Sequence, residues 1–399
     1  MIKGNAILGQ SGGPTSVINA SLVGCIEACQ KAEMIETVYG MCFGIEGFMQ
    51  EKIIDLGAEG AETLAGVRVT PGSALGSCRY KVQDTDFPKI LELFKKYDIR
   101  YYFLIGGNDT MDTIHRIEAY CKSQGYELWG VGVPKTVDND LFGTDHTPGF
   151  ASAARYVALS LKQSGQLARD MKKVDQFVIH QTIGRSAGWL PASAALAKES
   201  EDDAPHVILL PERPFERDKF LAAVKGAYDK YGWCSIICGE GVCYADGSPV
   251  SASTTGDKFS NVEFGAMGGS SAAMQLHRMI ADEFDWRGEF QVCESLPMCA
   301  SDRVVELDRE EAYACGKRAV ELAVEGTSGV MVTLVRESSD PYKCTLGTAP
   351  LGDVAVREKP MPDEFIGADG MSVTEACLEY LRPLLGPMPT YARFKNFPG

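Results

Sequence analysis

Short apolar runs alternate along the chain with longer segments in which apolar residues recur at helical spacing. The apolar runs predict buried strands at residues 5–10, 37–44, 101–107, 128–134, 174–182, 206–212 and 234–241. The amphipathic segments predict helices at residues 16–33, 87–97, 110–124, 147–170, 216–231 and 309–325. This alternation predicts an α/β fold in which helices cover both faces of parallel sheets.

Glycines and polar residues gather where the predicted strands end. Ligands of such folds bind at the carboxyl ends of the strands, so we expect function there. The C-terminal part, about residues 340–399, is rich in Pro and Gly and predicts an irregular extension. Composition marks no domain boundary, and the chain shows no internal repeat.

Composition narrows the class of protein. The 399 residues are 45% hydrophobic and 23% charged, as in soluble globular proteins of two or three domains. A net charge of −15 argues against nucleic acid as the main partner but leaves small phosphate ligands open. Thirteen cysteines without CxxC pairs, with no secretion signal or membrane-length apolar run, predict reduced thiols and a cytoplasmic location.

The first motif is "LGQSGGPTSVINAS", residues 8–21. A strand runs into Ser-Gly-Gly, and we expect a helix to open near Pro14 to Ser16. Backbone N–H groups of such a turn, together with a helix N-terminus, bind anions. A glycine-rich turn that serves only tight packing is the alternative.

The second motif is "YYFLIGGNDTMDT", residues 101–113. Gly106 and Gly107 would let the backbone approach a ligand, with Asn108 and Asp109 at the end of a strand. The alternative is that Asn108 or Asp109 caps the helix that follows.

The third motif, "GVPKTVDNDLFGTDH" (132–146), crowds Lys135 together with Asp138, Asp140 and Asp145. A lysine beside carboxylates suits phosphoryl transfer, because the lysine offsets charge on the moving group and an aspartate accepts the proton of the attacking hydroxyl. A polar loop with Asx-turns is the alternative.

Two further strand ends carry polar residues. "HQTIGRSAGW" (180–189) places a basic residue after glycine, and "ICGEGV" (237–242) places Glu240 between two glycines. The Glu240 carboxylate could accept hydrogen bonds from sugar hydroxyls, or could be a solvated or helix-capping residue.

In order, the segments SGGPT, GGND, PKTVDND, IGR and GEG resemble the phosphofructokinase family, and within it the pyrophosphate-dependent branch. The resemblance extends to "GKRAVELAVEGTSGVMVTL" (316–334). It implies two doubly wound, Rossmann-like domains: residues 1–143 with about 306–340 for the phosphoryl donor, and 144–305 for the sugar, followed by an extension at 341–399. It also implies Mg²⁺ as cofactor and a homodimer or homotetramer.

The resemblance assigns the donor site residue by residue. Asp138 is implied as the general base, and Lys135, Asp109 and Arg185 as further catalytic residues. Asp109 would exclude ATP by occupying the space of a nucleotide phosphate and, if buried, by repelling it. Asn108 stands where many members hold a Mg²⁺-binding aspartate. The implied diphosphate-binding residues are Gly12, Gly13, Arg79, Gly107, Asp109 and Lys135.

The acceptor site follows the same resemblance but departs from it at one end. The implied substrate-binding residues are Thr136, Asp138, Asp140, Ile183, Gly184, Arg185 and Glu240. The family clamps the 6-phosphate of fructose 6-phosphate with basic residues, one of them from a neighbouring subunit, where this chain has Gln176 and "LPMC" (Leu296–Cys299). Arg287, Arg303 or Lys258 could supply the charge instead.

Three functions remain open at this point. The leading one is reversible, diphosphate-dependent phosphorylation of fructose 6-phosphate. The second is the same chemistry on another sugar or polyol, because a lost bidentate Arg–phosphate contact weakens the clamp. The third is a non-catalytic regulatory subunit. Asp109 and Lys135 disfavour ATP as the donor.

Overall fold

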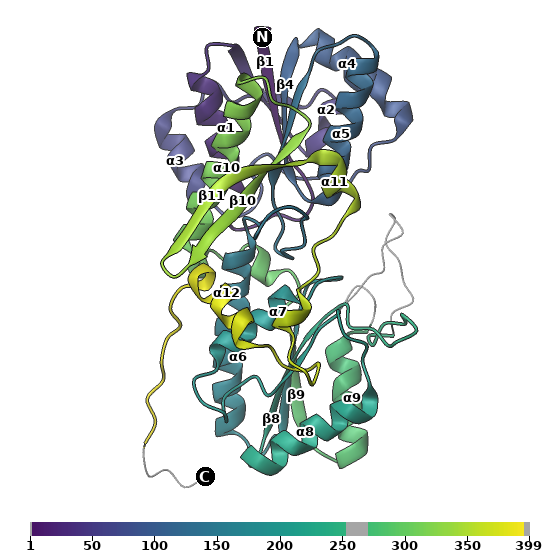
Figure 1. Cartoon of the computed structure of the whole chain (residues 1–399), viewed down its shortest axis with the longest axis vertical. Helices are drawn as coiled ribbons and strands as arrows, with labels where there is room; N and C mark the ends of the chain where they lie inside the picture. The colour runs from purple at the N-terminus through teal and green to yellow at the C-terminus, as the bar shows by residue number, and fades with distance from the viewer. Residues whose placement is uncertain (1, 253–269, 395–399) are drawn as a thin grey trace. The chain divides into compact units, whose positions relative to one another are not determined.

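The computed structural model describes residues 2–252 and 270–394 (Figure 1). They form two compact units, Met1–Ala153 with Ser295–Pro360 and Ala154–Glu294 with Met361–Gly399. The segment that we expected to be one extension at 341–399 is shared between the two units.

The first unit contains a seven-stranded sheet with the order β11-β10-β5-β4-β1-β2-β3. The pairs from β10 through β2 are parallel, whereas β3 and β11 run antiparallel to their neighbours. The strands are β1 (Gly4–Gln10), β2 (Ile35–Met41), β3 (Ile53–Asp55), β4 (Ile99–Gly106), β5 (Trp129–Pro134), β10 (Val330–Ser339) and β11 (Tyr342–Pro350).

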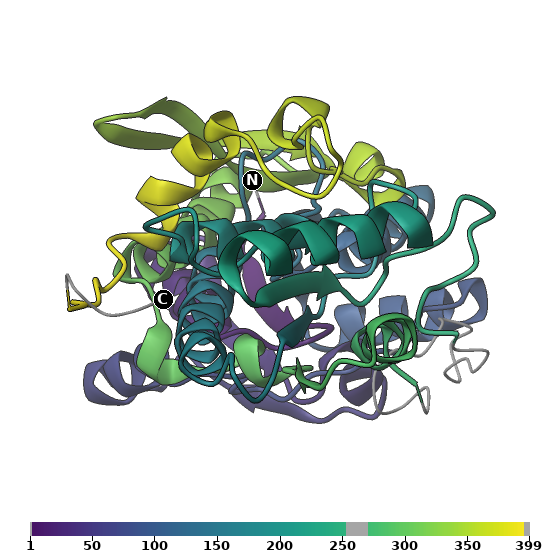
Figure 2. The ribbon, with the colours of Figure 1, turned by 90° about the horizontal axis from the view of Figure 1, so that it is seen from below.

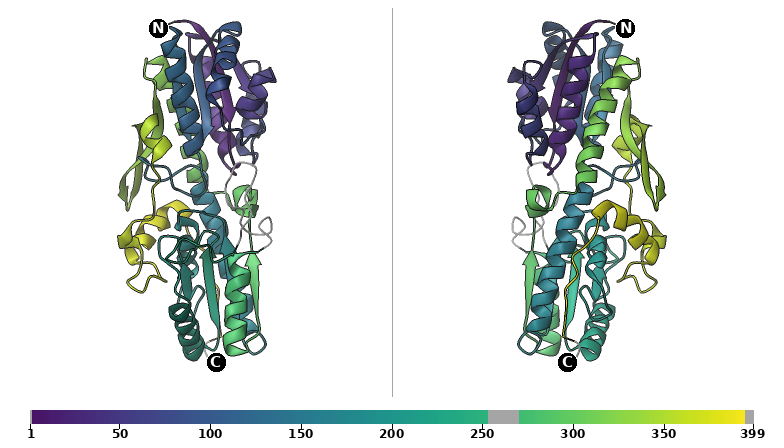
Figure 3. Two further views of the ribbon diagram at one scale, coloured as in Figure 1. Left: turned by 90° about the vertical axis from the view of Figure 1, so that its right-hand side faces the viewer. Right: turned by 90° about the vertical axis from the view of Figure 1, so that its left-hand side faces the viewer.

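Helices cover both faces of this sheet. Successive side chains of a strand point to opposite faces, and the apolar side chains on both faces are buried under helices. Tyr101 and Phe103 of β4 face α1 (Ile18–Lys31), α3 (Ala61–Val69) and α10 (Glu306–Val324). Tyr102 and Leu104 face the opposite layer of α2 (Gly44–Met49), α4 (Phe87–Lys96), α5 (Asn108–Ser123) and α11 (Leu351–Val356). Figure 3 shows α1, in purple, beside α10, in green.

The second unit contains a parallel four-stranded sheet with the order β7-β8-β6-β9. Its strands are β6 (Phe177–Thr182), β7 (Val207–Leu209), β8 (Cys234–Gly239) and β9 (Gly288–Val292). Phe177 and Ile179 pack with α8 (Arg217–Tyr231) and α9 (Ala272–Phe284), and Figure 2 shows α8 in front of the strands. The remaining helices are α6 (Phe150–Asp170), α7 (Trp189–Ser193) and α12 (Glu375–Leu385).

The predicted strands and helices all occur, so the α/β class with parallel sheets is confirmed. The expectation of an irregular segment at about 340–399 was wrong. Residues 342–350 form β11, and α11 and α12 follow. In the described part of this segment most Pro and Gly residues lie in the loops between and after these elements, whereas Gly347, Gly352 and Pro383 lie inside β11, α11 and α12.

Two further findings bear on the class of protein. All thirteen cysteines lie within the described residues and are free thiols. Among those residues, no helix is both long and apolar enough to span a bilayer.

Candidate active site

The turn after β1 is shaped by Gly12 and by the segment that contains Arg79. Gly12 has a φ of 76°, which a residue with a side chain rarely adopts. Its N–H donates to the Cys78 carbonyl (3.1 Å), and its carbonyl accepts from Ser77 Oγ (2.6 Å). These bonds place Arg79 next to the Gly12–Gly13 turn.

The helix after this turn begins at Ile18 rather than near Pro14 to Ser16 as expected. Thr15 Oγ1 accepts a hydrogen bond from Val17 N (3.3 Å), which holds residues 15–17 in a turn before the helix. The glycines are therefore not at the N-terminus of the helix. Any anion-binding capacity of Gly12 and Gly13 must come from turn N–H groups and nearby cations.

Lys135 is the cation at this turn. It follows β5, and its Nζ donates to the Gly13 carbonyl at 2.8 Å. Burial lowers the pKa of Lys135 to about 8, Asp138 and Asp140 oppose that shift, and the charge of Arg79 adds to it. The donor residues expected from two loops, Gly12–Gly13 and Lys135, thus meet.

The loop after Lys135 carries two of the predicted carboxylates. Asp138 N donates to Thr136 Oγ1 (3.1 Å), a local turn that fixes the backbone under Asp138. Burial raises the pKa of Asp140 to about 7, with further contributions from the charges of Asp138 and Glu358. The charges of Asp138 and Asp140 both raise the pKa of Lys135, so the ammonium lies close to two carboxylates.

Neither Asn108 nor Asp109 caps α5, so the capping alternative is not what the structure contains. Gly107 is the N-cap residue and makes no side-chain cap bond. Asn108 Nδ2 instead donates to the carbonyls of Val354 (3.0 Å) and Arg357 (2.9 Å), at the end of α11.

Asp109 projects into solvent. Its side chain is 80% exposed, with Oδ2 3.5 Å from Lys81 Nζ. The idea of a buried, strongly repelling carboxylate is therefore wrong, since solvent screens an exposed charge. A donor filter at Asp109 would therefore act through the space that its side chain occupies and through a weaker charge effect.

The second unit gathers the other group of predicted residues at the carboxyl ends of β6 and β8. Glu240 N donates to the Thr182 carbonyl (2.9 Å), which brings Glu240 beside the Ile183–Arg185 turn. Gly241 has no room for a side chain, because a Cβ there would lie 1.7 Å from the Arg185 carbonyl. Burial raises the pKa of Glu240, and the charge of Arg185 and an N–H group of Gly184 partly offset this.

The comparisons with known proteins agree with these motifs. The family model described as phosphofructokinase matches residues 5–323. The chain belongs to the phosphofructokinase family.

Relatives within this family span nearly the whole chain. A pyrophosphate–fructose 6-phosphate 1-phosphotransferase from Halomonas elongata is 40% identical over 96% of this chain and 92% of its own length. The solved pyrophosphate-dependent phosphofructokinase from Nitrosospira multiformis superposes with a TM-score of 0.88 at 37% identity, covering 99% of this chain and 95% of that one. A sulfofructose kinase from Alkalicoccus urumqiensis is 32% identical over 90% of this chain and 91% of its own length.

Against this family background, Gln176 lies away from the second unit's predicted sugar residues. It precedes β6, at the opposite end of the strand from Arg185. Gln176 Oε1 accepts a hydrogen bond from Arg287 N (3.0 Å), and the Arg287 guanidinium pairs with Asp175 at 2.8 Å.

The "LPMC" segment belongs to the first unit and forms a single 3₁₀ turn, Leu296–Met298. The Met298 methyl group lies against Gly13, since a Cβ on Gly13 would be 2.4 Å from it. An apolar side chain therefore covers part of the predicted donor turn. Arg303 Nε is 3.5 Å from Asp302, and Lys258 lies outside the described residues.

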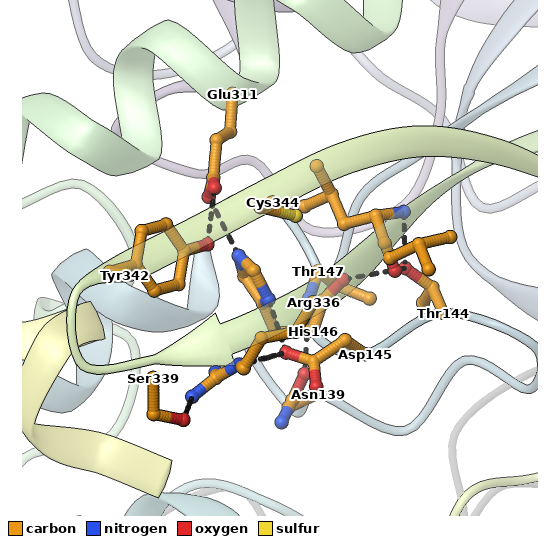
Figure 4. Close-up of polar contacts among 12 residues, drawn as sticks. Asn139, Thr144, Asp145, His146, Thr147, Glu311, Arg336, Ser339, Tyr342 and Cys344 are labelled. Atoms are coloured by element: carbon orange, nitrogen blue, oxygen red, sulfur yellow. Dashed lines mark hydrogen bonds and ion pairs between the residues drawn. The ribbon is translucent and has the colours of Figure 1, made fainter.

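The structure moves one predicted carboxylate out of the site and adds Lys359, a residue that the sequence motifs did not include. Asp145 does not join Asp138 and Asp140; it binds His146 (2.7 Å) and Arg336 (2.9 Å) in an internal network (Figure 4). Lys359 donates to the backbone of the Asp138 loop, and burial lowers its pKa to about 7, with the charges of Asp145 and Asp140 opposing the shift. The sequence around Lys359 is irregular and rich in proline and acidic residues, so no local pattern predicts this contact.

Proposed function

We propose that this chain moves a phosphoryl group reversibly between diphosphate and the 1-hydroxyl of fructose 6-phosphate, giving fructose 1,6-bisphosphate and phosphate. The observation that carries the proposal is the Lys135 ammonium on the Gly13 carbonyl, with Asp138 in the same loop. Relatives with this named activity support it.

In this mechanism Asp138 accepts the proton of the sugar hydroxyl, whose oxygen attacks the terminal phosphorus of diphosphate in line. The bond to the bridging oxygen breaks, and phosphate leaves. Lys135, Arg79 and backbone N–H groups around Gly12 and Gly13 hold the charge on the donor. Lys135 is suited to this because its ammonium is already buried and fixed.

Residues of the second unit would bind the sugar. Glu240 can accept hydrogen bonds from hydroxyl groups, and the N–H of Gly184 and the guanidinium of Arg185 can donate to anionic oxygens. We propose Arg185 as a catalytic residue, a role that the family resemblance implies. Thr136 and Asp140, on the Asp138 loop, complete the proposed substrate contacts.

Phosphofructokinases generally use a divalent metal, and we propose Mg²⁺ here. Among the described residues, no group of three or more His, Cys, Asp or Glu side chains is placed to hold a metal. Mg²⁺ is often bound by only one or two protein oxygens together with substrate phosphates. Asn108 Oδ1 and the Asp109 carboxylate, at the start of α5, could supply such oxygens. The two carbonyls that hold Asn108 Nδ2 orient that amide. When bound, Mg²⁺ would neutralise charge on diphosphate.

The function is tested by coupled assays of the purified chain in both directions. Diphosphate with fructose 6-phosphate should be turned over with Mg²⁺, and phosphate with fructose 1,6-bisphosphate should run the reaction backwards. ATP in place of diphosphate should give at most a few per cent of that rate, about 2 kcal/mol of discrimination or more. Preferred use of ATP, or no transfer with any donor, would refute the proposal.

A second candidate keeps this chemistry and changes the acceptor to a fructose without a 6-phosphate. The segment aligned with the clamp holds Met298, which lies against Gly13 of the predicted donor turn, and Gln176 is hydrogen-bonded to the Arg287 backbone. A relative named sulfofructose kinase is 32% identical over 90% of this chain. A panel of fructose 6-phosphate, a 6-sulfonate analogue and unmodified fructose decides this, because kcat/KM ranks the acceptors directly. A clear preference for fructose 6-phosphate would dismiss this candidate.

The non-catalytic alternative is disfavoured by the intact set of Lys135, Asp138 and Arg185. A regulatory subunit would have no need for a buried ammonium beside two carboxylates. A cytoplasmic location and a homodimer or homotetramer stay predictions.

Replacing Asp109 tests the donor filter. In Asp109→Gly, ATP use should rise by about fivefold to tenfold in kcat/KM, because an exposed charge at contact distance contributes about 1 kcal/mol in water. Use of diphosphate should fall modestly. Asp109→Asn keeps the size and removes the charge, so a rise only in the glycine variant assigns the effect to space. If neither variant changes the ratio of ATP to diphosphate use, Asp109 is not a filter.

A further inference from the structure

The position of Asp138 depends on its neighbour Asn139. Asn139 is fully buried and has a φ of 57°, in the left-handed region that residues with side chains seldom occupy. Its Oδ1 accepts a hydrogen bond from Thr147 N at 3.0 Å. The contacts that hold Asn139 in this conformation also constrain the backbone next to Asp138.

Lys359 supplies such contacts from a distant part of the first unit. Its Nζ donates to Asn139 Oδ1 (3.3 Å), to the Thr144 carbonyl (3.2 Å) and to the Asp145 carbonyl (2.6 Å). Its backbone N–H donates to the Asp140 carbonyl at 2.7 Å. One lysine thereby joins the two ends of the loop that carries Asp138.

The far end of this loop is anchored by a buried ion network (Figure 4). His146 lies between Asp145 Oδ2 (2.7 Å) and Glu311 Oε2 (2.6 Å), and Arg336 binds Asp145 from β10. Burial acts to lower the pKa of His146, but the two carboxylates outweigh it and raise the pKa, so the imidazolium form is favoured. Lys359 therefore connects Asn139 to a point fixed on α10 and β10.

The same short segment also holds the donor motif. The carbonyls of Val354 and Arg357 accept both hydrogen bonds of the Asn108 amide. Glu358 pairs with Leu141 in an antiparallel bridge. Residues 354–359, which we name the bridging segment, thus contact the start of α5 and the Asp138 loop at once.

We propose that the bridging segment sets the separation between the Asp138 loop and the Asn108–Asp109 motif, and that Lys359 is the positioning residue through which it acts. The catalytic part of this inference rests on the proposed function. A shift of about 1 Å in reacting groups can cost about a hundredfold in rate, so a residue that touches no substrate can still control kcat.

The test uses the full chain and three variants: Lys359→Met, Lys359→Gln and Lys343→Met. Lys343 is an exposed lysine of the same unit that pairs with Glu337 on the β10–β11 hairpin, and it is the control for the loss of one positive charge. Lys359→Met should lower kcat by about 10- to 100-fold with KM for diphosphate changed by less than about threefold. Lys359→Gln, which keeps donor N–H groups, should recover part of that loss, and Lys343→Met should match the wild type.

Hydrogen–deuterium exchange gives a readout that needs no turnover. Peptides covering residues 136–147 should exchange faster in Lys359→Met than in the wild type or Lys343→Met, while peptides of β1 and β4 stay protected. Unchanged kcat in a folded Lys359→Met protein, or a rise in exchange spread equally over β1, β4 and the loop, would overturn the inference. If the wild type transfers nothing from diphosphate, the proposed function fails, and the exchange pattern still decides the role of Lys359.

Discussion

Asp138→Asn should lower kcat by about 10²- to 10⁴-fold, the range that a positioned general base contributes. Asparagine has nearly the same shape and keeps the backbone turn to Thr136, but its amide cannot accept the hydroxyl proton at neutral pH. KM for diphosphate should change little, because the proposed donor contacts belong to other residues. Steady-state kinetics with the preferred acceptor measures both values.

The control for this substitution is Glu337→Gln, which removes an exposed carboxylate on β10 of the same unit. It should leave kcat unchanged. Circular dichroism and thermal melting should show both variants folded. Full activity of a folded Asp138→Asn protein would rule out Asp138 as the base and make its neighbour Asp140 the next candidate.

Lys135→Met should lower kcat/KM for diphosphate by about 10²- to 10³-fold, the cost of losing one preorganised group that stabilises developing charge. Methionine fills a similar volume without the ammonium. Because burial disfavours the charged lysine, its removal should keep or raise the melting temperature. A loss of activity together with retained stability separates the catalytic effect from misfolding.

The pH dependence offers a second view of Lys135. Its pKa of about 8 means that the free protein carries the ammonium below pH 8 and loses it above. In the wild type, kcat/KM for diphosphate should therefore fall as pH rises through about 8. Lys135→Arg stays charged throughout and should show lower activity without that decline. An identical decline in the arginine variant would assign the titration to another group.

Together these results would separate the role of Lys135, a fixed cation that binds the donor, from the role of Asp138, the general base. Lys135 is bound to Gly13 through its own side chain, whereas Asp138 depends on Asn139 and Lys359. Substitutions in the bridging segment are thus expected to affect kcat, and substitutions at Lys135 to affect the use of diphosphate. This difference is measurable before any ligand is seen bound.

Local patterns were enough to predict the α/β class and the order of the motifs. The continuous apolar run of β4 is typical of a strand that is buried on both faces. Tyr101 and Tyr102 indeed pack into the cores on opposite faces of the sheet. Strand ends with Gly and polar residues mark the ligand edge of a parallel sheet. These features are local in sequence, because side-chain periodicity and glycine conformation depend on only a few neighbouring residues. The antiparallel hairpin of β10 and β11 was missed because Pro and Gly residues around it masked the strand pattern.

Contacts between distant residues could not be read in the same way. The sequence marks Asn108 and Asp109 equally as helix caps or ligand-binding residues, and the fold turns Asn108 toward α11 and leaves Asp109 in solvent. Met298 reaches Gly13, and Lys359 reaches Asn139, across more than two hundred positions of chain. Side-chain direction at such sites follows from how whole elements pack, and no local period encodes it. The sequence was therefore sufficient to predict which residues carry the chemistry of each motif. The positions of the motifs relative to one another depend on how distant elements pack in the tertiary structure.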